Sequence, residues 1–200
     1  MTSIFIAATA SPRRHRILAD LGVAFEVFVP DCPEIHDDAD AVRTVSVNAL
    51  AKHAACARLH PDAWILAADT VVAFAGRCIG KPTSPQDARA MLLAFSGATQ
   101  DVFTAVAMSA PGHATELRVV ASSVTFRALD DAAVAAYLET AQTFDRAGGY
   151  DIATHGERII ASHAGSYTNI MGLPAETVRD WLLANGHPLP VRPTREQKRQ

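Results

Sequence analysis

The sequence predicts an α/β fold built on a mixed, twisted sheet with flanking helices. Short apolar runs alternate with amphipathic stretches along almost the whole chain, a pattern typical of strands and helices layered in one domain. Two β-rich runs, residues 102–110 and 117–126, enclose Pro111-Gly112, and this arrangement predicts an antiparallel hairpin. A hairpin within an α/β pattern indicates that the sheet is mixed rather than purely parallel.

The first half of the chain contains three predicted strand regions and two helices. Apolar runs predict strands at 4–8, 25–29 and 64–68, and the run 71–74 either continues the third strand or starts a hairpin through Gly76-Arg77. Helical spacing of apolar residues predicts helices at 13–21 and 42–59, with an acidic loop at 31–40 before the second.

The rest of the chain contains the hairpin, three helices and a last strand. Pro85 suits the first turn of a helix over 85–95, and Asp130 is a favourable cap for a helix over 130–140. A short strand is predicted at 158–161 and a final helix at 175–184. Loops that leave strand ends in such sheets usually line a ligand cleft.

Composition sets the broad class of the protein. The chain has 200 residues, of which 49% are hydrophobic, enough for one domain that we place at residues 1–187. The formal net charge of −3 gives no indication of nucleic-acid binding. Neither a signal peptide nor a membrane span is visible, and three widely spaced cysteines without a CxxC pair favour the cytoplasm.

Residues 188–200 differ from the rest of the chain. They are rich in Arg and Lys and contain prolines, so we expect a basic, solvated and disordered tail. Docking of this tail on RNA or on a partner is the alternative.

The segment Ser11-Pro12-Arg13-Arg14 follows the first strand and starts the first helix. Ser11 suits the N-cap and Pro12 the first helical position, so free backbone N–H groups point out of this turn. Two arginines here are disfavoured by the helix dipole unless an anion lies between them, and the guanidinium fork binds phosphate oxygens in pairs. The local pattern allows either an anion site or a solvated basic turn.

Two further charged positions stand out. Asp69 lies between two apolar runs, where the alternatives are a turn or capping residue, a metal ligand or a general base. Lys81 lies between Gly80 and Pro82, but Ala75 and Pro82 exclude a P-loop, and an isolated Lys is more often a surface residue. No HExxH motif and no GxSxG elbow are present, which argues against zinc catalysis and against a common serine hydrolase.

The order and spacing of several short motifs are more specific than any one of them. The motifs are Ser-Pro-Arg-Arg at 11–14, Lys52, Ala-Asp-Thr at 68–70, Gly-Lys-Pro at 80–82, Ser96-Gly97, Phe103-Thr104, Ala-Gly-Gly-Tyr at 147–150, Gly-Ser-Tyr at 165–167 and Gly-Leu-Pro at 172–174. Together they resemble the Maf family of nucleoside triphosphate pyrophosphatases over about residues 4–184.

The resemblance implies a fold and an activity. The fold would be related to that of the inosine triphosphate pyrophosphatases, with two lobes around a cleft. The activity would be hydrolysis of a nucleoside triphosphate to the monophosphate and pyrophosphate, with Mg²⁺ or Mn²⁺ and a house-cleaning role. A homodimer is a further expectation, and neither a nucleic acid nor a membrane is an expected partner.

The resemblance also implies roles for particular residues. Asp69 matches the catalytic carboxylate, and Glu34 with Asp69 would hold the metal, although whether Asp69 takes a proton or only binds metal stays open. Residues expected to bind the substrate are Ser11, Arg13, Arg14, Lys52, Thr70, Lys81 and Arg146.

The base preference is less clearly implied. Arg13 and Thr70 are similar to the branch that acts on dTTP and UTP, whereas the 7-methyl-GTP branch has Trp and Gln there. Ala153, however, stands where the pyrimidine branch has Gln, and Ala offers no side-chain hydrogen bond. Asp151 or Thr154 could substitute. A modified nucleotide and a purine-specific relative therefore remain alternatives. The resemblance leaves a further alternative, a non-catalytic regulator of septum formation, because the family is named for septum inhibition.

Overall fold

A computed structural model describes residues 3–141, 143 and 146–189 of the chain. The tail predicted from residue 188 lies, from residue 190 on, outside the described residues.

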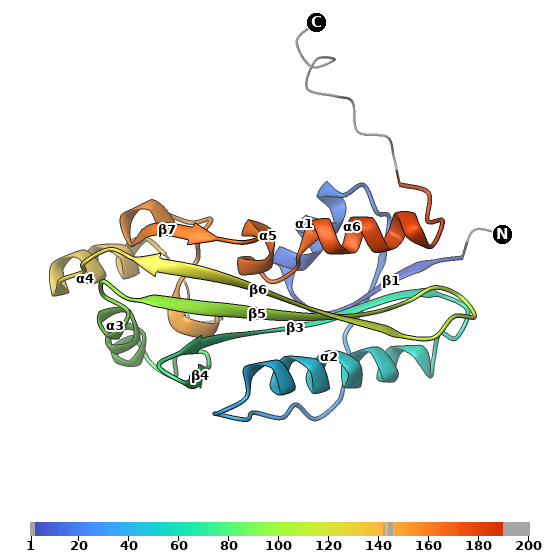
Figure 1. The fold of residues 1–200 in the computed structure, drawn as a ribbon, viewed down its shortest axis with the longest axis horizontal. Coiled ribbons are helices and arrows are strands. Elements are labelled where there is room, and N and C mark those ends of the chain that lie inside the picture. Colours follow the sequence, from blue (N-terminus) through green and yellow to red (C-terminus); the bar gives the residue numbers. More distant parts are fainter. Residues whose placement is uncertain (1–2, 142, 144–145, 190–200) are drawn as a thin grey trace, which may run out of the picture.

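The described residues form a seven-stranded mixed sheet, which confirms the predicted fold class (Figure 1). Its strands are, in sheet order, β2 (Glu26–Phe28), β1 (Phe5–Ala8), β3 (Trp64–Phe74), β5 (Thr99–Ser109), β6 (Glu116–Phe126) and β7 (Ile160–Ala164), with β4 (Arg77–Ile79) paired to β3. β1 is parallel to β2 and β3, and every other described pairing is antiparallel. The hairpin expected around Pro111-Gly112 is the β5–β6 pair.

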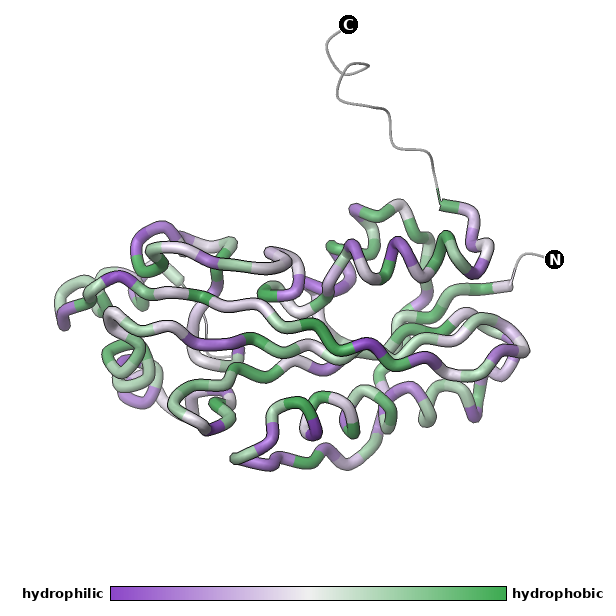
Figure 2. Tube along the Cα trace, in the orientation of Figure 1, coloured by the Kyte–Doolittle hydropathy of each residue, from purple (hydrophilic) through white to green (hydrophobic). Residues whose placement is uncertain are grey.

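Helices cover both faces of the sheet (Figure 1). They are α1 (Pro12–Asp20), α2 (Ala41–Ala57), α3 (Pro85–Ala94), α4 (Asp131–Thr140), α5 (Tyr167–Ile170) and α6 (Ala175–Ala184). α2 lies on one face, α1 and α6 lie on the other, and α3 and α4 lie at the far end of the long strands. Figure 2 shows hydrophobic and hydrophilic residues intermixed along α2 and α6. Among the residues described here, no helix is long and apolar enough to cross a membrane.

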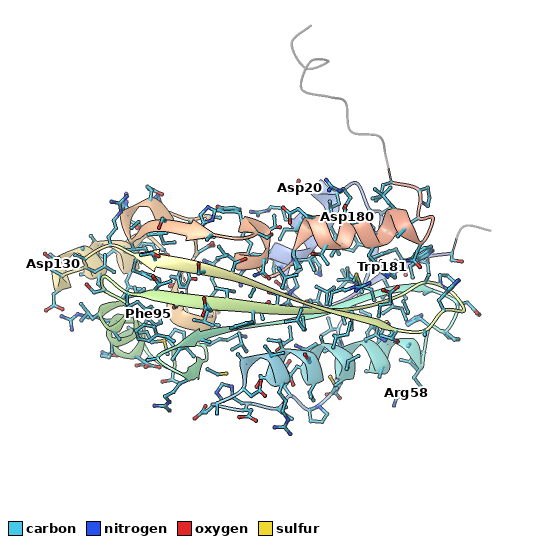
Figure 3. All side chains as sticks on the ribbon, in the orientation of Figure 1. Asp20, Arg58, Phe95, Asp130, Asp180 and Trp181 are labelled. Atoms are coloured by element: carbon cyan, nitrogen blue, oxygen red, sulfur yellow. The ribbon has the colours of Figure 1, made fainter. Side chains whose placement is uncertain are left out.

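The core is divided between the two ends of the sheet. One cluster joins β1, α1 and α6 and contains Leu18, Leu66 and Trp181, whose ring lies on the sheet side of α6 while Asp180 lies outside (Figure 3). A second cluster joins α3, α4 and β6 and contains Phe95 and Tyr137. The strands β3, β5 and β6, each 11 residues long, connect these clusters.

Three local features differ from the sequence prediction or complete it. The strand predicted at 158–161 is wrong at its start, because Gly156–Arg158 forms a 3₁₀ turn and β7 begins only at Ile160. β3 runs without a break from Trp64 to Phe74 and then turns back into β4, so both alternatives for residues 71–74 hold in part. The short helix α5 was not predicted; the Ser166 hydroxyl caps it by accepting a hydrogen bond from the Asn169 amide.

Candidate active site

The candidate site lies at a gap along one edge of β3. β1 pairs with β3 only as far as Leu66, and β4 pairs with it only from Val72 onward, while β5 pairs with the other edge throughout. β1 runs parallel to β3 and β4 runs antiparallel, so both strands end facing the gap. The turn with Ser-Pro-Arg-Arg therefore leaves one end of the gap, and the turn with Gly80-Lys81 leaves the other.

Asp69 lies within this gap, in the interior of a strand, so its interpretation as a turn or capping residue is wrong. Its carboxylate is 12% exposed. Asp69 Oδ1 accepts a hydrogen bond from Lys52 Nζ at 2.7 Å, and Oδ2 accepts one from Asn48 Nδ2 at 3.1 Å. Both partners lie on α2, which covers this face of the sheet. Two donors from one helix therefore fix the position of both Asp69 oxygens.

Lys52 joins the two predicted metal ligands. Its ammonium lies 2.8 Å from Glu34 Oε1 and 2.7 Å from Asp69 Oδ1. The Lys52 side chain is 13% exposed, whereas that of Glu34 is 56% exposed, so Glu34 forms the solvent side of this cluster. One cation thus already lies between the two carboxylates, which shows that both are within reach of a single positive charge.

Arg14 lies on the opposite face of the gap, and its guanidinium donates several hydrogen bonds within the protein. Its guanidinium donates to the Gly172 carbonyl at 2.8 Å, to the Ala68 carbonyl at 2.9 Å, to Thr70 Oγ1 at 2.9 Å and to Thr9 Oγ1 at 3.3 Å. The Ala68 carbonyl belongs to the part of β3 that has no strand partner on this edge, so Arg14 satisfies a backbone group the gap would leave open.

The pKa of the Arg14 guanidinium reports its surroundings. Burial lowers this pKa from its ordinary value, whereas the charges of Asp69 and Glu34 raise it and that of Arg13 lowers it. The guanidinium remains charged, since arginine does not lose its proton in proteins. These couplings place Arg13, Arg14, Glu34 and Asp69 in one electrostatic cluster.

Thr70 points away from Asp69, as neighbouring strand residues must. Its hydroxyl oxygen accepts the Arg14 hydrogen bond and lies 3.0 Å from Thr104 Oγ1 on β5. In the described structure the Thr70 hydroxyl thus holds the Arg14 guanidinium; its predicted contact with substrate stays a prediction.

The helix α1 begins at the candidate site without a side-chain cap. Ser11 is the N-cap, as predicted, and Pro12 is the first helical residue, but the Ser11 side chain makes no capping hydrogen bond. The N-cap side chains of α2, α3 and α4, by contrast, each accept a backbone N–H. Partly buried Arg13 lies in this first turn, so the start of α1 adds positive charge to the gap.

Lys81 and Arg146 lie in two segments that touch each other. The Gly148 amide donates to the Gly80 carbonyl at 2.9 Å, which brings these segments together. Lys81 is exposed at the open end of the gap. Arg146 Nη1 instead lies 2.6 Å from buried Asp151 Oδ2, so part of its charge is neutralised within the protein.

The loop that contains Ala153 is organised by Asp151. Asp151 Oδ1 accepts the Ala153 amide at 2.9 Å, and Oδ2 accepts the Thr154 hydroxyl at 3.1 Å in addition to Arg146. The suggestion that Asp151 or Thr154 takes over base recognition would require these contacts to be exchanged.

Asn48 and Gly172 are site residues that sequence reasoning missed. Asn48 precedes Lys52 by four residues, so helical spacing alone places both on one face of α2, and that signal was available. The Gly172 carbonyl accepts Arg14 Nε across 158 residues, and no local pattern indicates such a contact.

Comparison with known proteins identifies the family. A family model described as "Maf-like protein" matches residues 4–185. The chain belongs to the Maf family. Among similar proteins, a dTTP/UTP pyrophosphatase of Myxococcus xanthus is 39% identical over 192 residues, covering 95% of this chain and 96% of that protein. A dTTP/UTP pyrophosphatase of Deinococcus radiodurans is 40% identical over 173 residues, covering 86% and 88%.

The Maf-family chain also matches a protein of known structure. It is a nucleoside-triphosphatase, or dITP/XTP pyrophosphatase, from Mycobacterium abscessus, with a TM-score of 0.43 and 18% sequence identity. The match covers 90% of this chain and 92% of that one.

Proposed function

We propose that this Maf-family protein is a nucleoside triphosphate pyrophosphatase that releases the monophosphate and pyrophosphate. The observation that carries the proposal is the buried carboxylate of Asp69, held by Lys52 and Asn48 in a gap to which α1 contributes two arginines. The names of the relatives support the same activity.

The proposed reaction is an attack of water on the α-phosphorus. The water oxygen forms a bond to phosphorus, the bond to the bridging oxygen between the α- and β-phosphates breaks, and pyrophosphate leaves. Asp69 accepts the proton that the water loses, and its own two hydrogen bonds fix the direction of its remaining lone pairs. Arg13 and Lys81 lie at opposite ends of the gap, where their charges face the triphosphate, so positioning and electrostatics supply most of the rate.

The residues present fit a divalent cation of the Mg²⁺ or Mn²⁺ type. Glu34 and Asp69 offer oxygen ligands that a single ammonium already reaches together. Among the residues described, no group of three or more His, Cys, Asp or Glu side chains forms a closed metal cage. Magnesium ordinarily binds through one or two carboxylates, substrate phosphates and water, which suits this open pair. When bound, the cation supplies positive charge against the phosphate oxygens.

The proposed substrates are UTP and dTTP, and we expect modest discrimination between bases. Arg13 and Thr70 support the pyrimidine branch, as do the relatives' names. Ala153 offers no side-chain hydrogen bond, and its amide is already bound to Asp151. A site without a polar partner for the base distinguishes analogues only weakly, so modified nucleotides and 7-methyl-GTP belong in the same substrate panel.

The test is a panel of common and modified triphosphates with Mg²⁺ or Mn²⁺, read out as monophosphate and pyrophosphate. Asp69→Asn is expected to lower kcat by about 10²- to 10⁴-fold, the range that a positioned general base contributes. Asp101→Asn is the matched control, since Asp101 lies exposed on the neighbouring strand β5. Full activity in Asp69→Asn would refute the role of Asp69.

The alternative is a nucleotide-binding regulator of septum formation. It predicts nucleotide binding without turnover, and an effect on cell division that persists in Asp69→Asn. The cytoplasmic location and the homodimer both remain predictions; fractionation and sedimentation would test them.

A further inference from the structure

Asn48 contacts the backbone next to Glu34 as well as Asp69. It is 3% exposed and lies one helical turn before Lys52 on α2. Its Oδ1 accepts the Ile35 amide at 2.8 Å, and its Nδ2 donates both to the Ile35 carbonyl at 3.0 Å and to Asp69 Oδ2 at 3.1 Å. Both hydrogens of the Nδ2 group are therefore in use.

These contacts determine which way the Asn48 amide faces. The Ile35 amide must meet an oxygen and the Ile35 carbonyl must meet an N–H, so the reciprocal pair fixes the orientation. The second N–H is then directed at Asp69 Oδ2. A flipped amide would place Oδ1 against the Ile35 carbonyl and the Asp69 carboxylate, which are both acceptors.

The same contacts connect the two carboxylates of the site. Ile35 is the neighbour of Glu34, so Asn48 fixes the backbone that carries Glu34 as well as the oxygen of Asp69. Lys52 Nζ contacts the same two residues directly, at Glu34 Oε1 and Asp69 Oδ1. The pair Asn48 and Lys52 on one face of α2 thus sets the distance between the acidic loop and β3.

We propose that Asn48 is a positioning residue that holds the Glu34 and Asp69 carboxylates in register for the divalent cation and the triphosphate. This inference rests on the proposed function. Lys52 is a long, flexible cation, which can move when a divalent cation approaches the same oxygens. Asn48 is short, neutral and buried, so it keeps both backbone segments in place when that exchange occurs.

Three variants separate this role from a simple attachment of the loop. Asn48→Ala removes all three hydrogen bonds. Asn48→Asp keeps an acceptor for the Ile35 amide but places an oxygen against both Asp69 and the Ile35 carbonyl, and it also serves if the alanine variant does not fold. Thr44→Val is the matched control, because Thr44 Oγ1 accepts the Asp37 amide at 3.0 Å and attaches the same loop to α2 without touching Asp69.

Three measurements are made on each folded variant. Groups that orient metal ligands typically change metal affinity or activity by about 10- to 100-fold, so we expect losses of this size in Mn²⁺ affinity, titrated without nucleotide, and in kcat for both Asn48 variants. The KM at saturating Mn²⁺ is expected to change little, as for an interaction that acts on the reacting groups. In the metal-free protein, hydrogen exchange at the Ile35 amide is expected to accelerate in Asn48→Ala and to accelerate less in Asn48→Asp, which keeps the acceptor of this amide.

The outcomes are distinguishable from failure of the proposed function. A wild-type chain that releases no pyrophosphate refutes the proposed function, and Mn²⁺ affinity and Ile35 exchange still decide the role of Asn48. Wild-type Mn²⁺ affinity in both Asn48 variants overturns the inference. Equal losses in Thr44→Val overturn it as well, because loop attachment alone would then explain the effect.

Discussion

The ion pair between Arg146 and Asp151 offers a quantitative test of the structure. The Asp151 side chain is 7% exposed and the Arg146 side chain 18% exposed, with 2.6 Å between Arg146 Nη1 and Asp151 Oδ2. Removing one partner of a buried pair leaves the other charge uncompensated, which costs about 3 to 5 kcal/mol. Because Arg146 keeps some contact with water and has a further interaction besides Asp151, we take the lower end of that range for the charge alone.

Two variants divide the effect into its parts. Asp151→Asn removes the charge but keeps an acceptor for the Ala153 amide. Only the charge contribution is then lost, and the free energy of unfolding should fall by about 3 kcal/mol. Asp151→Ala also loses the hydrogen bonds from Ala153 and Thr154, each of which contributes about 1 kcal/mol, so it should lose about 5 kcal/mol. The measurement is the free energy of unfolding in urea, and the two variants are compared provided that their m-values agree.

An exposed ion pair provides the control. Arg179 and Asp180 lie 3.0 Å apart with side chains 52% and 68% exposed, so Asp180→Ala should change the free energy of unfolding by less than about 1 kcal/mol. If Asp151→Ala loses no more than Asp180→Ala, the assumption that burial makes the Arg146–Asp151 pair costly to break is refuted. Such a result would also return Arg146 to the residues available for phosphate.

Two further predictions concern the backbone and a buried thiol. Gly172 has φ of +105°, so Gly172→Ala should lower the free energy of unfolding by about 1–3 kcal/mol and shift the carbonyl that accepts Arg14, which lowers activity. The control is Gly76→Ala, at a hairpin with open space around it, which should lower stability but not activity. Thermal unfolding and turnover assays test this, and equal activity in the two variants would contradict it. Burial raises the pKa of the Cys56 thiol from 9.0 to about 11, so the native state keeps a proton that the unfolded chain loses first, and the free energy of unfolding should fall as pH rises from about 9 towards 11. Urea unfolding across that pH range checks this, and a Cys56→Ala variant with an identical slope would rule out the thiol as the cause.

Much of the fold was predictable because it depends on local patterns. The helix at 175–184 was predicted with its observed bounds, and α1 and α2 begin one residue before the predicted starts. Apolar periodicity and capping residues act over a few positions, so one sequence reveals them. β7 was misplaced at its start, since Gly156–Arg158 forms a 3₁₀ turn that periodicity does not distinguish from a strand beginning.

The sequence motifs grouped part of the candidate site but revealed few of its connections. Family motifs grouped Asp69, Lys52 and Glu34, and the structure does bring their charges together. The motifs did not reveal that Arg14 donates four hydrogen bonds within the protein, and two of its acceptors, Ala68 and Gly172, are backbone carbonyls. Any residue type can provide a backbone carbonyl, so composition holds no trace of such a contact.

The long strands also bear on how the molecule can move. β3, β5 and β6 pass without interruption from one hydrophobic cluster to the other (Figure 1). Rotation of one end against the other must therefore twist a continuous hydrogen-bonded ladder, which resists torsion far more than a peptide linker does. Asp69 lies near the middle of β3, where such a torsion displaces atoms least. We expect slow opening motions to change the two ends of the molecule and to leave the geometry around Asp69 almost unaltered.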